Sequence, residues 1–164
     1  MIVLSIDVGI KNLAVTKVIF DGDKSIHDIQ PNLIDITKQK KTLTYEQTIE
    51  NLIDAMNKLN FGDVDIVIIE NQPSMKNPKM KTIAVALYMY FKMKDKKVKF
   101  VSPSLKLSKE ENKKSYKERK KLSIEKTLDL LNDECKKKLE MYKKIDDITD
   151  TILMSYVWIR KNKR

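Results

Sequence analysis

Cysteine, histidine, glycine and long apolar runs are all scarce in this chain of 164 residues. The single Cys135 cannot form an internal disulfide, which suits a reducing compartment, and with only one histidine the chain offers no His/Cys metal cluster. The most apolar segment, residues 83–93, is far shorter than the roughly 20 residues that span a bilayer. The start of the chain lacks the basic, apolar and small-residue pattern of a signal peptide. We therefore expect an intracellular protein with no membrane partner.

Positive charge, in contrast, is abundant. The chain has 33 basic and 23 acidic residues, for a net charge of +10, which favours a polyanionic partner such as nucleic acid. Nearly all the basic residues are lysines, a bias that an A+T-rich genome can also produce, so the position of the lysines is more informative than their number. The length and the 41% of apolar residues predict a single domain over residues 1–164 with a substantial core.

The hydrophobic pattern predicts an α/β fold. Asp21-Gly22 favours a hairpin turn because both residues tolerate positive φ, and Thr44 with Gln47 has the spacing of a capping box. Three antiparallel strands are expected first, then helices alternating with strands that run parallel. The expected strands are 2–6, 13–20, 25–36, 65–69 and 98–101, and the expected helices are 44–60, 81–93, one ending near 132, and 144–162.

The first strand ends in a carboxylate that is costly to bury. Asp7 follows a nearly continuous apolar run, and an ionised carboxylate in such a place must be paired, hydrogen-bonded or bound to a cation. Gly9 leaves room for something large to approach the backbone. Our hypothesis is that Asp7 is the first ligand of a metal site. The alternative is a strand that ends in an ordinary Asp-x-Gly turn.

A second apolar strand ends in the same way. Glu70 directly follows residues 66–69, all of them Ile or Val, and Pro73 stops the strand. In open α/β sheets the carboxyl ends of the strands form the edge where sites are built. Two adjacent parallel strands would bring Asp7 and Glu70 together, where they repel each other unless a cation lies between them. Taken alone, Glu70 could equally be an acidic turn residue.

The final helix carries acids in its first two turns. Asp147 and Asp150 are three residues apart and can point at one place, whereas Asp146 lies about 100° from Asp147 around the helix axis and could instead be the N-cap. Some acid is expected there in any case, because it complements the helix dipole.

The densest positive segment precedes this helix, at residues 113–121, and it includes Tyr116. It is either a phosphate-binding surface or simply a solvated face. The candidate DNA-binding residues are Lys11, Lys106, Lys113, Lys114, Lys117, Arg119, Lys120 and Lys121.

Four segments resemble one known family: IDVGIKNLA at the start, IENQP in the middle, then YKERKKLSIE, and KKIDDITDTILM near the end. They are similar to the Holliday junction resolvases of the poxvirus type, relatives of bacterial RuvC and of the yeast mitochondrial resolvase. The resemblance covers essentially the whole chain. It implies a ribonuclease H-like fold, with a mixed five-stranded sheet of three antiparallel and then two parallel strands, flanked by helices.

The resemblance also implies an activity and a site. The expected activity is that of a magnesium-dependent endonuclease, a homodimer that makes paired symmetric nicks in four-way DNA junctions during recombination or the resolution of viral concatemers. The nicks would carry 5′-phosphate and 3′-hydroxyl ends, and a viral protein of this kind would work in the host cytoplasm. The implied catalytic acids and metal ligands are Asp7, Glu70, Asp147 and Asp150, with Asp146 outside this set.

The expected cofactors are two Mg²⁺ ions per site, replaceable by Mn²⁺, with no small-molecule cofactor. Two ions are expected because a pair stabilises both the attacking and the leaving oxygen. Asp7 is expected to bridge them. The resemblance further implies a functional lysine in the basic segment, for which Lys117 is the first choice, followed by Lys114 and Lys106.

Three other functions compete with this interpretation. Asp-x-Gly after a strand also resembles the phosphate loop of sugar kinases and actin-like ATPases, but a chain with three glycines lacks their second Gly-rich loop. A ribonuclease H-like nuclease acting on RNA–DNA hybrid or other branched DNA is a stronger alternative. A non-catalytic nucleic-acid-binding module is the third, and it gives no reason for acids at both strand ends.

Overall fold

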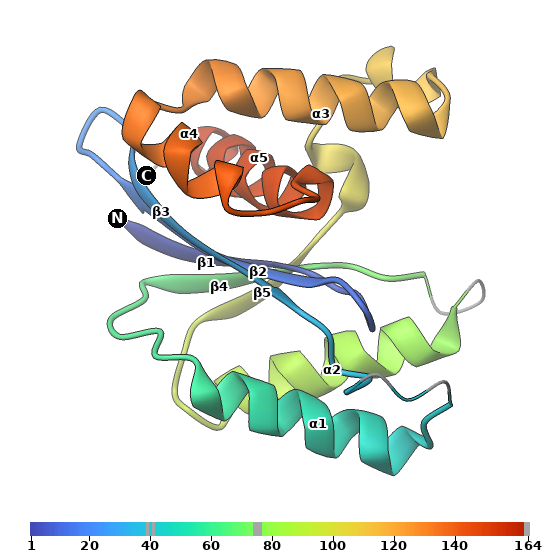
Figure 1. Ribbon diagram of the computed structural model, residues 1–164. Helices are drawn as coiled ribbons and strands as arrows, with labels where there is room; N and C mark the ends of the chain where they lie inside the picture. Colours follow the sequence, from blue (N-terminus) through green and yellow to red (C-terminus); the bar gives the residue numbers. More distant parts are fainter. Residues whose placement is uncertain (39, 41, 74–76, 163–164) are drawn as a thin grey trace.

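The computed structural model describes residues 1–38, 40, 42–73 and 77–162. Its centre is a five-stranded sheet with the order β3-β2-β1-β4-β5 (Figure 1). β1 (Ile2–Asp7), β2 (Leu13–Phe20) and β3 (Ile26–Ile34) are antiparallel neighbours, while β4 (Ile66–Glu70) and β5 (Val98–Val101) run parallel to β1. The predicted mixed sheet, with three antiparallel strands followed by two parallel ones, is confirmed.

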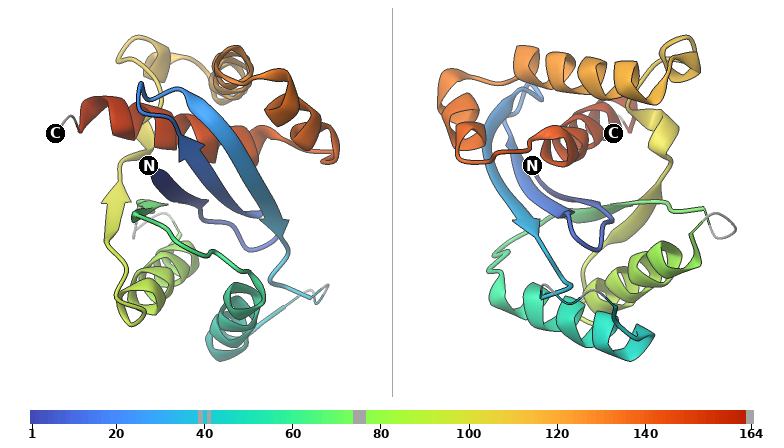
Figure 2. Two further views of the ribbon diagram at one scale, coloured as in Figure 1. Left: turned by 90° about the vertical axis from the view of Figure 1, so that its left-hand side faces the viewer. Right: turned by 45° about the vertical axis from the view of Figure 1, so that its right-hand side comes forward.

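Helices cover both faces of the sheet (Figures 1 and 2). α1 (Tyr45–Lys58) and α2 (Pro78–Lys92) form one layer. On the other face α5 (Asp146–Lys161) lies on the sheet, α3 (Tyr116–Leu130) packs outside it, and α4 (Asp133–Glu140) lies beside β3. Short 3₁₀ turns at Pro103–Leu105 and Glu111–Lys113 lead from β5 to α3. Within the described residues, no helix combines the length and apolar character needed to cross a membrane.

The period-two alternation of strand side chains decides which way the strand-end acids point. Leu4 and Ile6 pack into the core under α1 and α2, whereas Val3 packs into the core under α5. Asp7 has the same parity as Val3, and Glu70 has the same parity as Ile66 and Ile68 on the α5 side. Because Ile6 pairs with Ile69 in the parallel register, the sheet brings both carboxylates to one edge and one face.

The helices differ from the predicted ones mainly at their ends. The capping box of Thr44 and Gln47 is confirmed. α2 begins at Pro78, before the expected residue 81, because the Asn77 side chain accepts a hydrogen bond from the Met80 backbone and caps the helix. α4 was not predicted. Of the roles left open for Asp146, that of N-cap does not hold, because Ile145 is the N-cap residue and the Asp146 carboxylate contacts Lys120.

Two turns also correct the predictions. The hairpin between β2 and β3 forms, but its positive φ belongs to Lys24 (69°) rather than to Asp21 or Gly22. At Gly9 the close neighbour is the chain itself, because an added Cβ would lie 2.3 Å from the carbonyl oxygen of Asn12. Gly9 therefore permits the tight turn that leads from β1 to β2.

Candidate active site

A cavity of about 310 Å³ opens at the carboxyl ends of β1 and β4, beside α3 and α5. The ionisable side chains that line it come from four helices and strands and from one connecting segment. Asp7 comes from β1, Glu70 from β4, Asp147 and Asp150 from α5, Lys120 from α3, and Lys106 from the segment after β5. The structure thus brings together in one cavity all four acids expected from the sequence.

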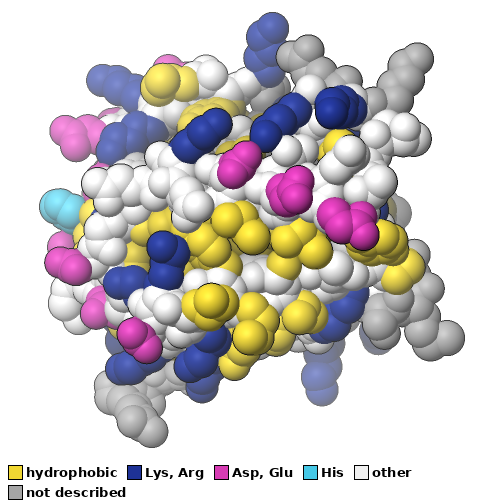
Figure 3. Space-filling view, turned by 90° about the horizontal axis from the view of Figure 1, so that it is seen from below, with side chains coloured by type: hydrophobic (Ala, Val, Ile, Leu, Met, Phe, Trp, Pro, Cys, Tyr) yellow, Lys and Arg dark blue, Asp and Glu magenta, His cyan; other side chains and the backbone are white. Residues whose placement is uncertain are grey.

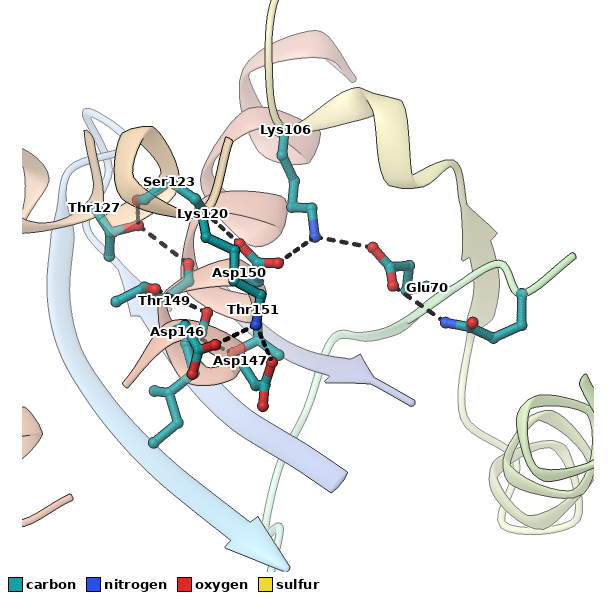
Figure 4. A network of polar contacts seen from close by, with 12 residues as sticks. Glu70, Lys106, Lys120, Ser123, Thr127, Asp146, Asp147, Thr149, Asp150 and Thr151 are labelled. Atoms are coloured by element: carbon teal, nitrogen blue, oxygen red, sulfur yellow. Dashed lines mark hydrogen bonds and ion pairs between the residues drawn. The ribbon is translucent and has the colours of Figure 1, made fainter. Parts of the chain in front are cut away.

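Lys106 lies between two of these acids (Figure 4). Its Nζ is 2.9 Å from Oε1 of Glu70 and 2.8 Å from Oδ2 of Asp150. The three side chains are only 11% to 17% exposed, and Oε2 of Glu70 accepts a further hydrogen bond from Gln72 at 3.1 Å. Two carboxylates from distant parts of the chain therefore share one cation.

The acids differ in how strongly their charge is supported. Burial, followed by the neighbouring Glu70, raises the pKa of Asp7 well above its usual value. Burial also acts to raise the pKa of Glu70, but the Lys106 ammonium and the side-chain hydrogen bonds with Asp7 and Gln72 together outweigh it, and this pKa is lowered. Burial would lower the pKa of Lys106, yet Glu70 and Asp150 outweigh burial and raise it. Of these acids, Asp7 is therefore the one whose ionised form is not sufficiently compensated by nearby positive charge.

A second group of ion pairs holds the start of α5. Lys120 contacts both Asp146 and Asp147, the latter at 3.2 Å, and Lys144 lies 2.9 Å from the other oxygen of Asp147. Burial acts to raise the pKa of Asp146, but the hydrogen bond from Lys120 and the positive charges of Lys120 and Lys144 together outweigh it, and the pKa is lowered. Asp147 thus lines the cavity with its carboxylate held by two lysines.

One face of α3 presents polar groups to α5. Residues 120, 123 and 127 share this face at helical spacing. Ser123 Oγ donates to Oδ1 of Asp150, and Thr127 Oγ1 is 3.1 Å from the carbonyl oxygen of Thr149 (Figure 4). Asp150 therefore has one oxygen held by Ser123 and the other by Lys106. Sequence analysis missed Ser123, although its spacing of three from Lys120 could have indicated a shared face.

The donor set suits a hard cation. The cavity offers carboxylate oxygens, which Mg²⁺ prefers, and Glu70 and Asp150 already share the positive charge of Lys106. In the part of the chain that the structure describes, no three Asp, Glu, His or Cys side chains are grouped closely enough to hold an ion as they stand. The side chains lining the cavity are thus of the chemical type that binds a metal ion, and in this structure lysine ammonium groups balance their negative charge.

The candidate basic residues divide into two sets. Lys106, Arg119 and Lys120 line the cavity. The exposed residues outside it are Lys11, Lys113, Lys114, Lys117 and Lys121. Lys117, the first choice for the functional lysine, is thus outside the cavity, while Lys106 contacts two of the acids.

Solved structures with this fold include Holliday junction resolvases. The fowlpox virus resolvase, solved with its substrate Holliday junction DNA, has a TM-score of 0.69 and 26% identity, covering 99% of this chain and 100% of the relative. Thermus thermophilus RuvC has a TM-score of 0.67 and 13% identity, covering 96% and 92% respectively. The fold is therefore that of the RuvC-like resolvases.

The chain belongs to the Poxvirus A22 protein family, which it matches over residues 1–162. Among curated proteins, uncharacterized protein L451 of Acanthamoeba polyphaga mimivirus is 34% identical over an alignment 160 positions long, which takes in 80% of this chain. The chain spans 38% of the length of that relative. The family expected from the sequence motifs is confirmed.

Proposed function

We propose that this protein is a Holliday junction resolvase, a nuclease that makes paired symmetric nicks in four-way DNA junctions. The observation that carries the proposal is the convergence of Asp7, Glu70, Asp147 and Asp150 in one cavity, in a chain of the Poxvirus A22 family. Its fold is shared with the fowlpox virus resolvase, which was solved with junction DNA.

The reaction is hydrolysis of a phosphodiester, in which water attacks phosphorus and the 3′ oxygen leaves. The four acids would hold two Mg²⁺ ions, replaceable by Mn²⁺, which supply an activated water and stabilise the leaving oxygen. Breaking the bond to the 3′ oxygen leaves 5′-phosphate and 3′-hydroxyl ends. The high pKa of Asp7 supports this role, because a buried carboxylate with too little counter-charge favours a cation nearby.

Lys106 is the functional lysine in this proposal. Its contacts with Glu70 and Asp150 support the assignment, because an ammonium at that place can neutralise the acids or a phosphate that enters the cavity. Arg119 and Lys120 on the cavity wall would contact the DNA strand close to the cut. The exposed lysines at 113, 114, 117 and 121 would bind phosphates further along the arms.

The active form in this proposal is a homodimer, because two opposed strands must be cut and each protomer would contribute one acidic cavity to the cutting. Figure 3 shows apolar side chains gathered on the face seen from below, where the layer of α1 and α2 lies. On and beside α2, Val85 (44%), Met89 (52%) and Met93 (81%) are exposed. A soluble protein rarely leaves such a surface uncovered, and an isologous contact with a second copy would cover it.

The test uses a synthetic four-way junction, a linear duplex of the same sequences and an added RNA–DNA hybrid, each with Mg²⁺ or with EDTA. Paired symmetric nicks in the junction alone, only with metal, are expected on a denaturing gel. Cleavage of an RNA–DNA hybrid alone would move the function to another nuclease of this fold. Tight junction binding without cleavage would contradict the enzymatic proposal.

A further inference from the structure

Tyr116 is an exposed aromatic residue on the wall of the acidic cavity. It is the first residue of α3, it is 66% exposed, and it lines the cavity with Asp7 and Glu70. It belongs to neither hydrophobic core cluster and to none of the apolar side chains packed against them. Packing of the fold therefore does not account for this ring.

The start of α3 is well defined where Tyr116 lies. Ser115 and Glu118 form a capping box that fixes the first turn of the helix. The Nζ of Lys120 lies 5.3 Å from the centroid of the ring, and Lys120 is itself held by Asp146 and Asp147. The ring thus contacts a lysine of the same ion-pair network as the cavity acids. Because this contact already restricts the side chain, little further conformational entropy is lost when the ring binds a ligand.

The charges around the ring indicate what it would contact. Arg119 and Lys120 line the same cavity, and the neighbouring Lys113, Lys114 and Lys117 are exposed. An exposed aromatic ring among cations is the combination that binds a nucleic acid strand through its phosphates and the flat face of a base. In a continuous duplex both faces of each base are stacked, whereas a branch point can offer a free face.

We propose that Tyr116 stacks on an unstacked nucleobase at the branch point of the DNA, next to the phosphate that enters the cavity. This inference rests on the proposed function and adds to it a base-binding subsite. The subsite would help to distinguish branched DNA from linear duplex, since only the branched substrate presents a base to the ring.

The chain contains a matched control in Tyr45. Tyr45 is also the first residue of a helix with a capping box, it is 48% exposed, and the Nζ of Lys79 lies 5.7 Å from its ring centroid. It lies on α1, in the helical layer on the opposite face of the sheet from α3 (Figure 1). The two tyrosines thus have similar local settings and differ in their position relative to the cavity.

The test measures the fluorescence of 2-aminopurine placed in turn at each branch-point nucleotide of an immobile junction, in EDTA so that no strand is cut. Wild type and Tyr116→Phe are expected to quench one position, whereas Tyr116→Leu and Tyr116→Ala are not. Junction affinity should fall about ten-fold or more in the Leu and Ala variants, the size usual for loss of one stacked base. Tyr45→Ala should behave as wild type.

Thermal melting verifies that each variant is folded at the assay temperature. If the Ala variant is not, the Leu variant, which keeps a large apolar side chain at this position, still tests the inference. Wild-type quenching and affinity in both non-aromatic variants would overturn the inference and leave the proposed function intact. A wild-type protein that neither binds nor nicks the junction would overturn both.

Discussion

The Lys106 ammonium lies between the mostly buried carboxylates of Glu70 and Asp150, where it supplies the positive charge that a metal ion would otherwise supply. Removing one partner of such a group leaves the others uncompensated in a medium that solvates charge poorly. We predict that Lys106→Met lowers the free energy of unfolding in EDTA by about 3 kcal/mol. Urea denaturation followed by circular dichroism measures this, and added Mg²⁺ should restore much of the loss because it supplies positive charge to the same acids.

Lys121 gives the control for this prediction. It lies 3.7 Å from Glu125, but its side chain is 79% exposed, and exposed pairs contribute little to stability. Lys121→Met should unfold as wild type does. If Lys106→Met were as stable as wild type in EDTA, the two carboxylates would not need the ammonium and the site would be described wrongly.

Asp7 makes stability depend on pH in the metal-free protein. Its pKa is raised in the folded state by burial and by Glu70, so the folded state binds more protons than the unfolded state above about pH 4. Stability conferred by the protonated form is therefore complete at low pH and is lost as pH rises through the folded-state pKa. We predict that Asp7→Asn removes this loss and is more stable than wild type at neutral pH in EDTA.

Denaturation midpoints of both proteins between pH 4 and pH 8 in EDTA measure this difference. Wild type and variant should approach each other at the acidic end, where Asp7 is protonated in the folded state and about half protonated in the unfolded state. A constant difference across this range would show that Asp7 does not titrate as its surroundings indicate.

Helix α3 fixes the acids of α5 through one face. Ser123 donates to Asp150, so Ser123→Ala frees one oxygen of a proposed metal ligand without leaving a large cavity. Groups that orient metal ligands typically contribute 10- to 100-fold, and we predict a loss of about this size in the cleavage rate. The loss should shrink at high Mg²⁺ if it reflects weaker metal binding.

Thr127→Val, one turn further on, is the matched control. Thr127 bonds backbone carbonyl groups of Ser123 and Thr149 rather than an acid, so its replacement should cost about 1 kcal/mol of stability and leave the cleavage rate of the folded protein unchanged. Equal cleavage rates in the Ser123 and Thr127 variants would remove the role assigned to Ser123.

The strands and most helices follow from the sequence because their apolar periodicity is strong. α4 does not, because its eight residues DECKKKLE carry only two buried apolar side chains, Cys135 and Leu139. The strand-end acids were predictable because a carboxylate after a buried strand is unusual. The position of Lys106 in the site could not be predicted. A dense run of lysines shows where positive charge is concentrated along the chain, whereas the contact of Lys106 with Glu70 depends on β5 lying next to β4 in the sheet.

The whole molecule presents an apolar surface on α2 that we assign to the dimer. We predict that Met89→Glu yields a monomer at micromolar concentration in sedimentation velocity, because a charge on this face would be buried without a partner. Met141→Glu is the control, since Met141 is 82% exposed in the turn after α4 and should leave the dimer intact. A wild-type monomer would contradict the assignment directly.

The most direct test of the account compares wild type with Asp150→Asn on one labelled four-way junction in Mg²⁺. Asp129→Asn, an exposed acid on α3, serves as control. The account predicts paired symmetric nicks from wild type and the control, and full binding without nicks from Asp150→Asn, because this position contributes one of the four converging acids. Nicking by Asp150→Asn at the wild-type rate would contradict the central claim that these acids form the site of cleavage.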